Sequence, residues 1–168
     1  MPPTLILFFI LALVAIVSAL GMLFSRNAVI AAMFLILNFL TVAILYLILD
    51  APFIAVAQVT VYAGAIMVLF LFVIMLLGAE QTGRTPERWW IQPVSLLLGG
   101  AFLVELIAVM IGLFRNPSTA ASLPAGFGSP VAVGETLFIK YVLPFEATSI
   151  LLLIAMIGAI VLTRAEKK

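Results

Sequence analysis

Three acidic side chains lie in or next to long apolar runs, where a charge is unexpected. Glu105 is near the centre of the run 94–114, Asp50 closes the run 29–49, and Glu146 follows Pro144 near the start of the last run. A carboxylate inside a membrane costs several kcal/mol, so such a group is neutral, paired or in contact with water. Acids of this kind mark proton relays, and Glu105, Asp50 and Glu146 are therefore candidates for a proton path.

Cysteine and histidine, two residue types that often bind metals or take part in catalysis, are missing. The 168 residues include no Cys and no His. The chain therefore has no thiolate metal site, no thiol nucleophile and no imidazole, which is the commonest metal ligand. We expect that this chain holds no redox cofactor of its own.

Uncharged polar and small residues gather in the first half of the run 53–77. Tyr62 lies about 14 Å along the helix from Phe53, close to the middle of a membrane, where its hydroxyl needs a partner in the protein or in trapped water. Gln58 is four residues away and is expected on the same side. The second half of the run is uniformly bulky and apolar, which is typical of contact with lipid or apolar neighbours.

Small side chains at Ala57, Thr60 and Gly64 form a stripe that predicts close approach of a neighbouring helix. Gly64 and the β-branched residues 59–61 are also mediocre helix formers. The segment is thus a candidate for a π-bulge that changes the winding of the helix. The simpler interpretation, that these residues only hold helices together, stays open.

The composition places all of these residues in a membrane protein. Hydrophobic residues make up 66% of the chain and charged residues 9%, with a mean hydropathy of +1.39 and a net charge of +1. An average soluble domain is about half apolar and about a quarter charged. A soluble enzyme, a nucleic-acid-binding protein and a disordered regulator are excluded, and the lipid bilayer is the expected surrounding.

Five apolar runs are long enough to cross a membrane as helices. They predict an all-α integral membrane protein, a single membrane domain over residues 1–168, with helices at about 4–24, 29–49, 53–77, 94–114 and 141–162. The stretch 115–135 is rich in Pro, Gly and Ser and is expected to be a connection without helical periodicity. The first run has no basic segment before it and is too long for a signal peptide, so we expect it to be retained.

Basic residues divide unequally between the two sides of such a protein. One side carries six, Arg26, Arg84, Arg88, Arg164, Lys167 and Lys168, and the other carries two, Arg115 and Lys140. The positive-inside rule then predicts the N-terminus outside and the C-terminus in the cytoplasm. A Trp89–Trp90 pair falls where an interfacial aromatic belt is expected.

Two separated blocks closely resemble chain J of bacterial respiratory complex I, the family of mitochondrial NADH dehydrogenase subunit 6. The first is Gln58-Val-Thr-Val-Tyr-Ala-Gly-Ala-Ile-Met and the residues up to Leu77. The second is Gly134-Glu-Thr-Leu-Phe followed by Tyr141-Val-Leu-Pro-Phe-Glu-Ala-Thr-Ser and the residues up to Ala159. The Arg26-Asn27 turn and Asn38 also fit. The resemblance covers the first three helices and the fifth; the fourth matches only in length.

The resemblance implies a membrane-arm subunit of a proton-translocating NADH:quinone oxidoreductase in the bacterial plasma membrane. Such a chain is a non-catalytic subunit of the enzyme and an obligate hetero-oligomer with other membrane-arm subunits, while flavin, iron–sulfur clusters and quinone belong to partner subunits. In the family, the third helix carries a π-bulge around the motif that Tyr62, Ala63 and Gly64 match here. The resemblance implies that this helix, including Thr60 and Gln58, switches winding and couples quinone reduction to proton pumping.

The three acids fit this resemblance unequally. No family motif surrounds Glu105, so it is either a proton relay or a neutral or paired structural acid. Glu146 belongs to the matching Pro-Phe-Glu, and we interpret it first as an acid in the first turn of the fifth helix, where the helix dipole favours it. Many relatives carry an acid in the short turn at Pro52 or at Gln58, and here Asp50 must take such a role if one exists.

Two other classes of protein compete with this interpretation. One is a membrane subunit of a multisubunit cation/proton antiporter or membrane-bound hydrogenase, which has related helices. The other is a lone small transporter or assembly scaffold, which the lack of an internal repeat disfavours.

Overall fold

The computed structural model describes residues 3–78, 91–115 and 126–164, and these are helical with no strand. They fall into two compact units, Met1–Leu76 with Ala125–Lys168, and Leu77–Pro124. Five of the helices are long and apolar enough to cross a membrane, which confirms the predicted fold class. The predicted roles of Arg84, Arg88, Trp89–Trp90, Lys167 and Lys168 concern residues outside the described ranges.

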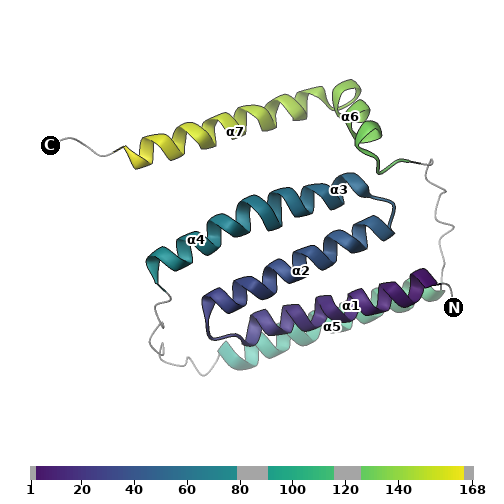
Figure 1. The fold of residues 1–168 in the computed structure, drawn as a ribbon. Helices are drawn as coiled ribbons and strands as arrows, with labels where there is room; N and C mark the ends of the chain where they lie inside the picture. The colour runs from purple at the N-terminus through teal and green to yellow at the C-terminus, as the bar shows by residue number, and fades with distance from the viewer. Residues whose placement is uncertain (1–2, 79–90, 116–125, 165–168) are drawn as a thin grey trace. The chain divides into compact units, whose positions relative to one another are not determined.

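The first two spans, α1 (Pro3–Phe24) and α2 (Ala28–Ile48), form a hairpin (Figure 1). The turn is fixed by Asn27, whose side chain accepts hydrogen bonds from the N–H groups of Val29 (2.9 Å) and Ile30 (3.4 Å). Gly21 allows the helices to come close, because a Cβ there would lie 2.8 Å from the Phe34 ring. The geometry of the hairpin is thus determined by the Asn27 cap in the turn and by the close contact of Gly21 with Phe34.

Polar side chains join the two helices of the hairpin deeper in the apolar layer. The Asn38 amide on α2 donates to the Ala15 carbonyl (2.8 Å) and to the Ser18 hydroxyl (3.0 Å) on α1. Ser18 is buried and itself donates to the Ala15 carbonyl (2.9 Å). Hydrogen bonds of this kind associate helices where water and the hydrophobic effect are absent.

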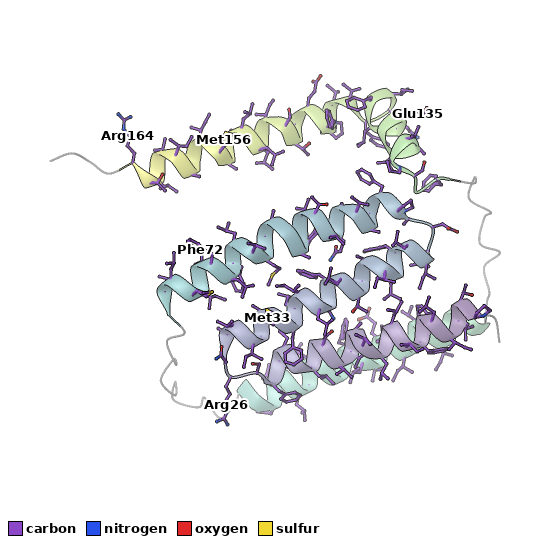
Figure 2. All side chains as sticks on the ribbon, in the orientation of Figure 1. Arg26, Met33, Phe72, Glu135, Met156 and Arg164 are labelled. Carbon is purple, nitrogen blue, oxygen red and sulfur yellow. The ribbon has the colours of Figure 1, made fainter. Side chains whose placement is uncertain are left out.

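The third span, Pro52–Leu77, consists of three helical segments that continue one another. They are α3 (Pro52–Ala57), the π-helix η1 (Gln58–Ile66) and α4 (Met67–Leu77). Figure 1 shows this span running back alongside α2, which contacts both α3 and η1. Met67 is the one buried residue of α4, and the apolar side chains beyond it extend away from the ribbon, as Phe72 does in Figure 2.

The fourth span, α5 (Ile91–Arg115), belongs to the second compact unit and is described by itself. It begins before the expected residue 94, because the apolar count stopped at the polar Gln92 and at Pro93. Glu105 lies in the central part of α5 and is exposed.

A short helix that the sequence analysis did not predict precedes the last span. We expected residues 115–135 to be a connection without helix, yet α6 spans Pro130–Ile139. Ser129 caps it by accepting a hydrogen bond from the Ala132 N–H (3.3 Å), and Pro130 occupies its first turn. A Ser-Pro pair of this kind is a recognised start signal for a helix and was present in the sequence.

The last span, α7 (Val142–Thr163), begins two residues before Pro144. Pro144 fits in the first turn, because the N–H groups of that turn need no intrahelical partner. The sequence analysis placed Glu146 in the first turn as well, and the start at Val142 corrects this. Glu146 therefore lies beyond the first turn, where the dipole effect has already decreased. An edge-to-face contact between Phe138 and Phe145, with centroids 4.8 Å apart, joins α6 to α7.

Candidate functional site

The nine-residue π-helix η1 is the irregular feature of the third span. The Gln58 N–H still donates to the carbonyls of Ile54 and Ala55, whereas the Met67 N–H donates to the carbonyl of Tyr62, five residues earlier. This i→i+5 bond is the mark of π winding. It confirms the predicted π-bulge in the third helix and extends it from a single turn to Gln58–Ile66.

Gly64 has a specific steric reason to be glycine. A Cβ at this position would lie 3.1 Å from the Val59 carbonyl oxygen, five residues earlier in the same segment. That distance is tighter than ordinary van der Waals contact, so a side chain would press on the backbone of the π turn. The residue predicted from its weak helical preference is thus the one that leaves room for the irregular backbone.

Tyr62 presents its ring to α2. The rings of Tyr62 and Phe39 meet edge to face with centroids 5.8 Å apart and an interplanar angle of 68°. Tyr62 is 48% exposed, and its hydroxyl has no hydrogen-bond partner within the part of the chain that the structure describes. Gln58 and Ala63 are half-buried in the same segment. The hydroxyl is therefore free to bind water or a group from outside this chain.

The predicted stripe of small residues is largely uncovered in the part of the chain that the structure describes. Thr60 and Gly64 are exposed and Ala57 is only half-buried, while the buried residues of the third span are Ala55 and Met67. The stripe was counted with α-helical spacing. Because η1 has more residues per turn, that spacing does not keep side chains on one face.

Two contributors to this site were not singled out by sequence reasoning. Phe39 supplies the ring against Tyr62, and its neighbour Asn38 makes the hydrogen bonds that bind α2 to α1. Asn38 had been noted only as part of the family resemblance. A polar pair at Ser18 and Asn38, each within an apolar run, was the available signal for this contact.

The three candidate acids belong to different elements of the described structure. Asp50 lies in the turn after α2 with a left-handed φ of 55°, and Glu146 is exposed on α7. Glu105 belongs to the other compact unit. The described residues contain no salt bridge to these carboxylates and no group of three or more acidic, His or Cys side chains arranged for a metal.

A multi-pass α-helical membrane protein with a π-helical third span is the class that this fold and site define. Residues 18–162 match the family described as NADH-ubiquinone/plastoquinone oxidoreductase chain 6. The chain belongs to this family. The match runs through the fourth span, where the sequence resemblance had given agreement in length alone.

Individual relatives agree with this membership. The chain is 42% identical over 164 residues to NAD(P)H-quinone oxidoreductase subunit 6 of the Paulinella chromatophora organellar chromatophore, covering 96% of this chain and 78% of the relative. It is 40% identical to chain 6 of the Synechocystis enzyme, covering 95% and 80%. It is 37% identical to NADH-quinone oxidoreductase subunit J of Rhodobacter capsulatus, covering 93% and 79%. These similarities favour an oxidoreductase subunit over an antiporter or hydrogenase subunit and over a lone transporter.

Proposed function

We propose that this chain is a membrane-arm subunit that couples quinone reduction to proton pumping through a change of winding in η1. The observation that carries the proposal is the π segment Gln58–Ile66, with its hydrogen bond from Met67 to Tyr62. A π segment inside an α-helix is a common feature of functional sites. A π turn contains one more residue than an α turn, so a change between the two shifts the register of the helix that follows.

A return to α winding would have a large effect on the second half of the span. The Met67 N–H would then donate to the Ala63 carbonyl instead of the Tyr62 carbonyl. A shift of one residue turns the following helix by about 100° and moves it about 1.5 Å along its axis. Ala55 and Met67, the buried residues on either side of η1, would change their relative direction by that angle.

Tyr62 is the polar group that such a change re-aims. Its hydroxyl has no partner among the described residues, and in the middle of a membrane it must bind water or a polar group. We propose that π winding and α winding place this hydroxyl differently, so that a chain of water molecules is completed in one state and interrupted in the other. The ring contact with Phe39 stabilises the position that Tyr62 has in the π-wound state.

The remaining assignments belong to the same proposal. Glu105 carries protons, with Asp50 and Glu146 as further candidates for the path. This chain is non-catalytic and holds no cofactor, while flavin, iron–sulfur clusters and quinone are held by partner subunits of the complex. The protein is an obligate hetero-oligomer in a bacterial plasma membrane, with its N-terminus outside and its C-terminus in the cytoplasm.

The test is Gly64→Val in the complete complex. Valine places a β-branched side chain where a Cβ is already 3.1 Å from the Val59 carbonyl oxygen, and it restricts the backbone. We expect assembled complexes to keep electron transfer from NADH to an artificial acceptor and to lose much of the pumping linked to quinone reduction. Tyr62→Phe, which keeps the ring and removes the hydroxyl, should lose part of the coupled rate.

The matched control is Gly158→Val on α7, where an added Cβ meets nothing within 4 Å in this chain. It should assemble and pump normally. A Gly64→Val complex that pumps as many protons per electron as the wild type would contradict the proposal.

A further inference from the structure

The loop before α6 lies against the turn between α2 and the third span. The Phe53 N–H donates a hydrogen bond of 3.1 Å to the Gly128 carbonyl. A Cβ on Gly128 would lie 2.7 Å from the Ala51 Cα and would also overlap the Asp50 carbonyl oxygen. The contact is therefore backbone against backbone, and no side-chain rotation can make room for a larger residue at Gly128.

This hydrogen bond completes the start of the third helix. Pro52, the first helical residue, has no N–H, and the N-cap residue Ala51 makes no side-chain hydrogen bond to the helix. Phe53 follows, and the first N–H groups of a helix have no partner within it. The Gly128 carbonyl thus acts as the cap that the local sequence lacks.

Both sides of the contact have fixed conformations. Gly126 has a left-handed φ of 80°, and its carbonyl accepts a hydrogen bond from the Ser129 N–H (2.9 Å). Ser129 in turn caps α6 through its hydroxyl. On the opposite side, Asp50 has a left-handed φ of 55°, which few residues other than glycine adopt. The loop 126–129 therefore has a fixed conformation where it contacts the N-terminus of α3.

We infer that Gly128 is a positioning residue that holds α3 in place while η1 changes its winding. The inference rests on the proposed function. The start of the third span is held by α2 and by the loop 126–129, whereas α4 has no buried side chain after Met67. With α3 fixed, a change in η1 must move α4; with α3 free, part of the change would be lost at the unattached end.

The experiment compares Gly128→Ala with Gly134→Ala in the complete complex. Both add one methyl group, but at Gly134, on α6, a Cβ meets nothing within 4 Å in this chain. Hydrogen exchange at the Phe53 amide should be slow in the wild type and in Gly134→Ala. It should be about tenfold faster in Gly128→Ala, the effect typical of a lost helix cap. Protons pumped per electron should fall in Gly128→Ala alone, with unchanged electron transfer to an artificial acceptor.

A milder pair of variants serves if Gly128→Ala does not assemble. Ser129→Ala removes the cap that fixes the loop, and Thr136→Ala removes a hydroxyl that donates only within α6, to the Ala132 carbonyl. Ser129→Ala should speed exchange at Phe53 and lower the pumping ratio, and Thr136→Ala should do neither. Fast exchange at Phe53 in the wild type would overturn the inference. So would an unchanged pumping ratio in a variant whose Phe53 exchange has increased.

The same measurements separate this inference from the proposed function. If Gly64→Val uncouples the complex while the loop variants do not, only the positioning role of Gly128 is wrong. If the loop variants change exchange at Phe53 but neither they nor Gly64→Val change the pumping ratio, the winding change itself is wrong.

Discussion

Gly64 and Tyr62 contribute to the site in opposite ways, one by lacking a side chain and the other by presenting one. Gly64 leaves space for the Val59 carbonyl oxygen, which a Cβ would approach to 3.1 Å. Tyr62 places a ring against Phe39 and leaves its hydroxyl without a partner among the described residues. A winding change needs both properties, because the backbone must have room to rearrange and a polar group must move with it.

Glu105 provides a prediction that is independent of the third helix. Glu105→Gln keeps the size of the side chain and removes its ability to release a proton. If Glu105 relays protons, the variant complex should assemble and transfer electrons to an artificial acceptor normally but pump fewer protons per electron. Normal pumping would make the acid dispensable, and loss of the whole complex would show that the carboxyl group packs against a partner.

The helices themselves were predictable because length and apolar composition are strong signals for membrane spans. The five expected spans are present, with ends that differ from the predicted ones by at most a few residues. The short helix α6 was missed because its first half lies in a stretch, 115–135, that was judged by its Pro, Gly and Ser content. The Ser129-Pro130 pair indicated a helix start, but the prediction relied on the composition of the whole stretch.

The interior of the third span was harder to predict from sequence. Family resemblance placed a π-bulge near Tyr62 and Gly64, and β-branched residues with a glycine were compatible with it. The stripe Ala57, Thr60 and Gly64 was counted with a constant α-helical period, which η1 does not keep. Within the described part of the chain the third span buries Ala55 and Met67, so close packing of a helix on the stripe stays a prediction. The hydrogen bond between Phe53 and Gly128 joins segments that are far apart in the sequence. No local sequence pattern indicates such a contact, so it could not be predicted.

The α1–α2 hairpin gives a prediction about stability. Asn38→Ala removes two hydrogen bonds to α1, to Ala15 and Ser18. Interhelical hydrogen bonds in membranes are worth about 0.6 kcal/mol each, so the expected loss is about 1 kcal/mol. It should appear as a lower midpoint for thermal dissociation of the purified complex. The control, Ser149→Ala, removes a hydroxyl that donates only to Glu146 in its own helix, and its midpoint should not change. Equal midpoints for the two variants would argue against a stabilising role for the Asn38 hydrogen bonds.

At the scale of the whole molecule, the described part of the chain buries very few of its side chains. Among the described residues the buried apolar side chains are Ala32, Ala43, Ala55 and Met67, and α7 has no buried residue. Helices of this composition are covered by lipid or by other helices. Such a chain depends on its surroundings for most of its packing, which is consistent with a subunit of a multisubunit oxidoreductase.

The proposed orientation in the membrane rests on the six-to-two division of basic residues between the two sides. A cysteine introduced at Ser122 should react with an impermeant thiol reagent added to intact cells, and one at Thr82 should react only after the membrane is opened. Both positions lie outside the described residues, in the connections on either side of α5. The opposite labelling pattern would reverse the proposed topology.

The winding of η1 in the working enzyme tests the central claim most directly. Structures of the complete complex, determined at rest and during turnover, would show which carbonyl accepts the Met67 N–H. In the present structure the acceptor is Tyr62, five residues earlier. We predict a second population during turnover in which the acceptor is Ala63, four residues earlier, with α4 rotated by about 100° relative to α3. A Met67–Tyr62 bond retained in every population of an enzyme that is pumping at full rate would contradict the claim.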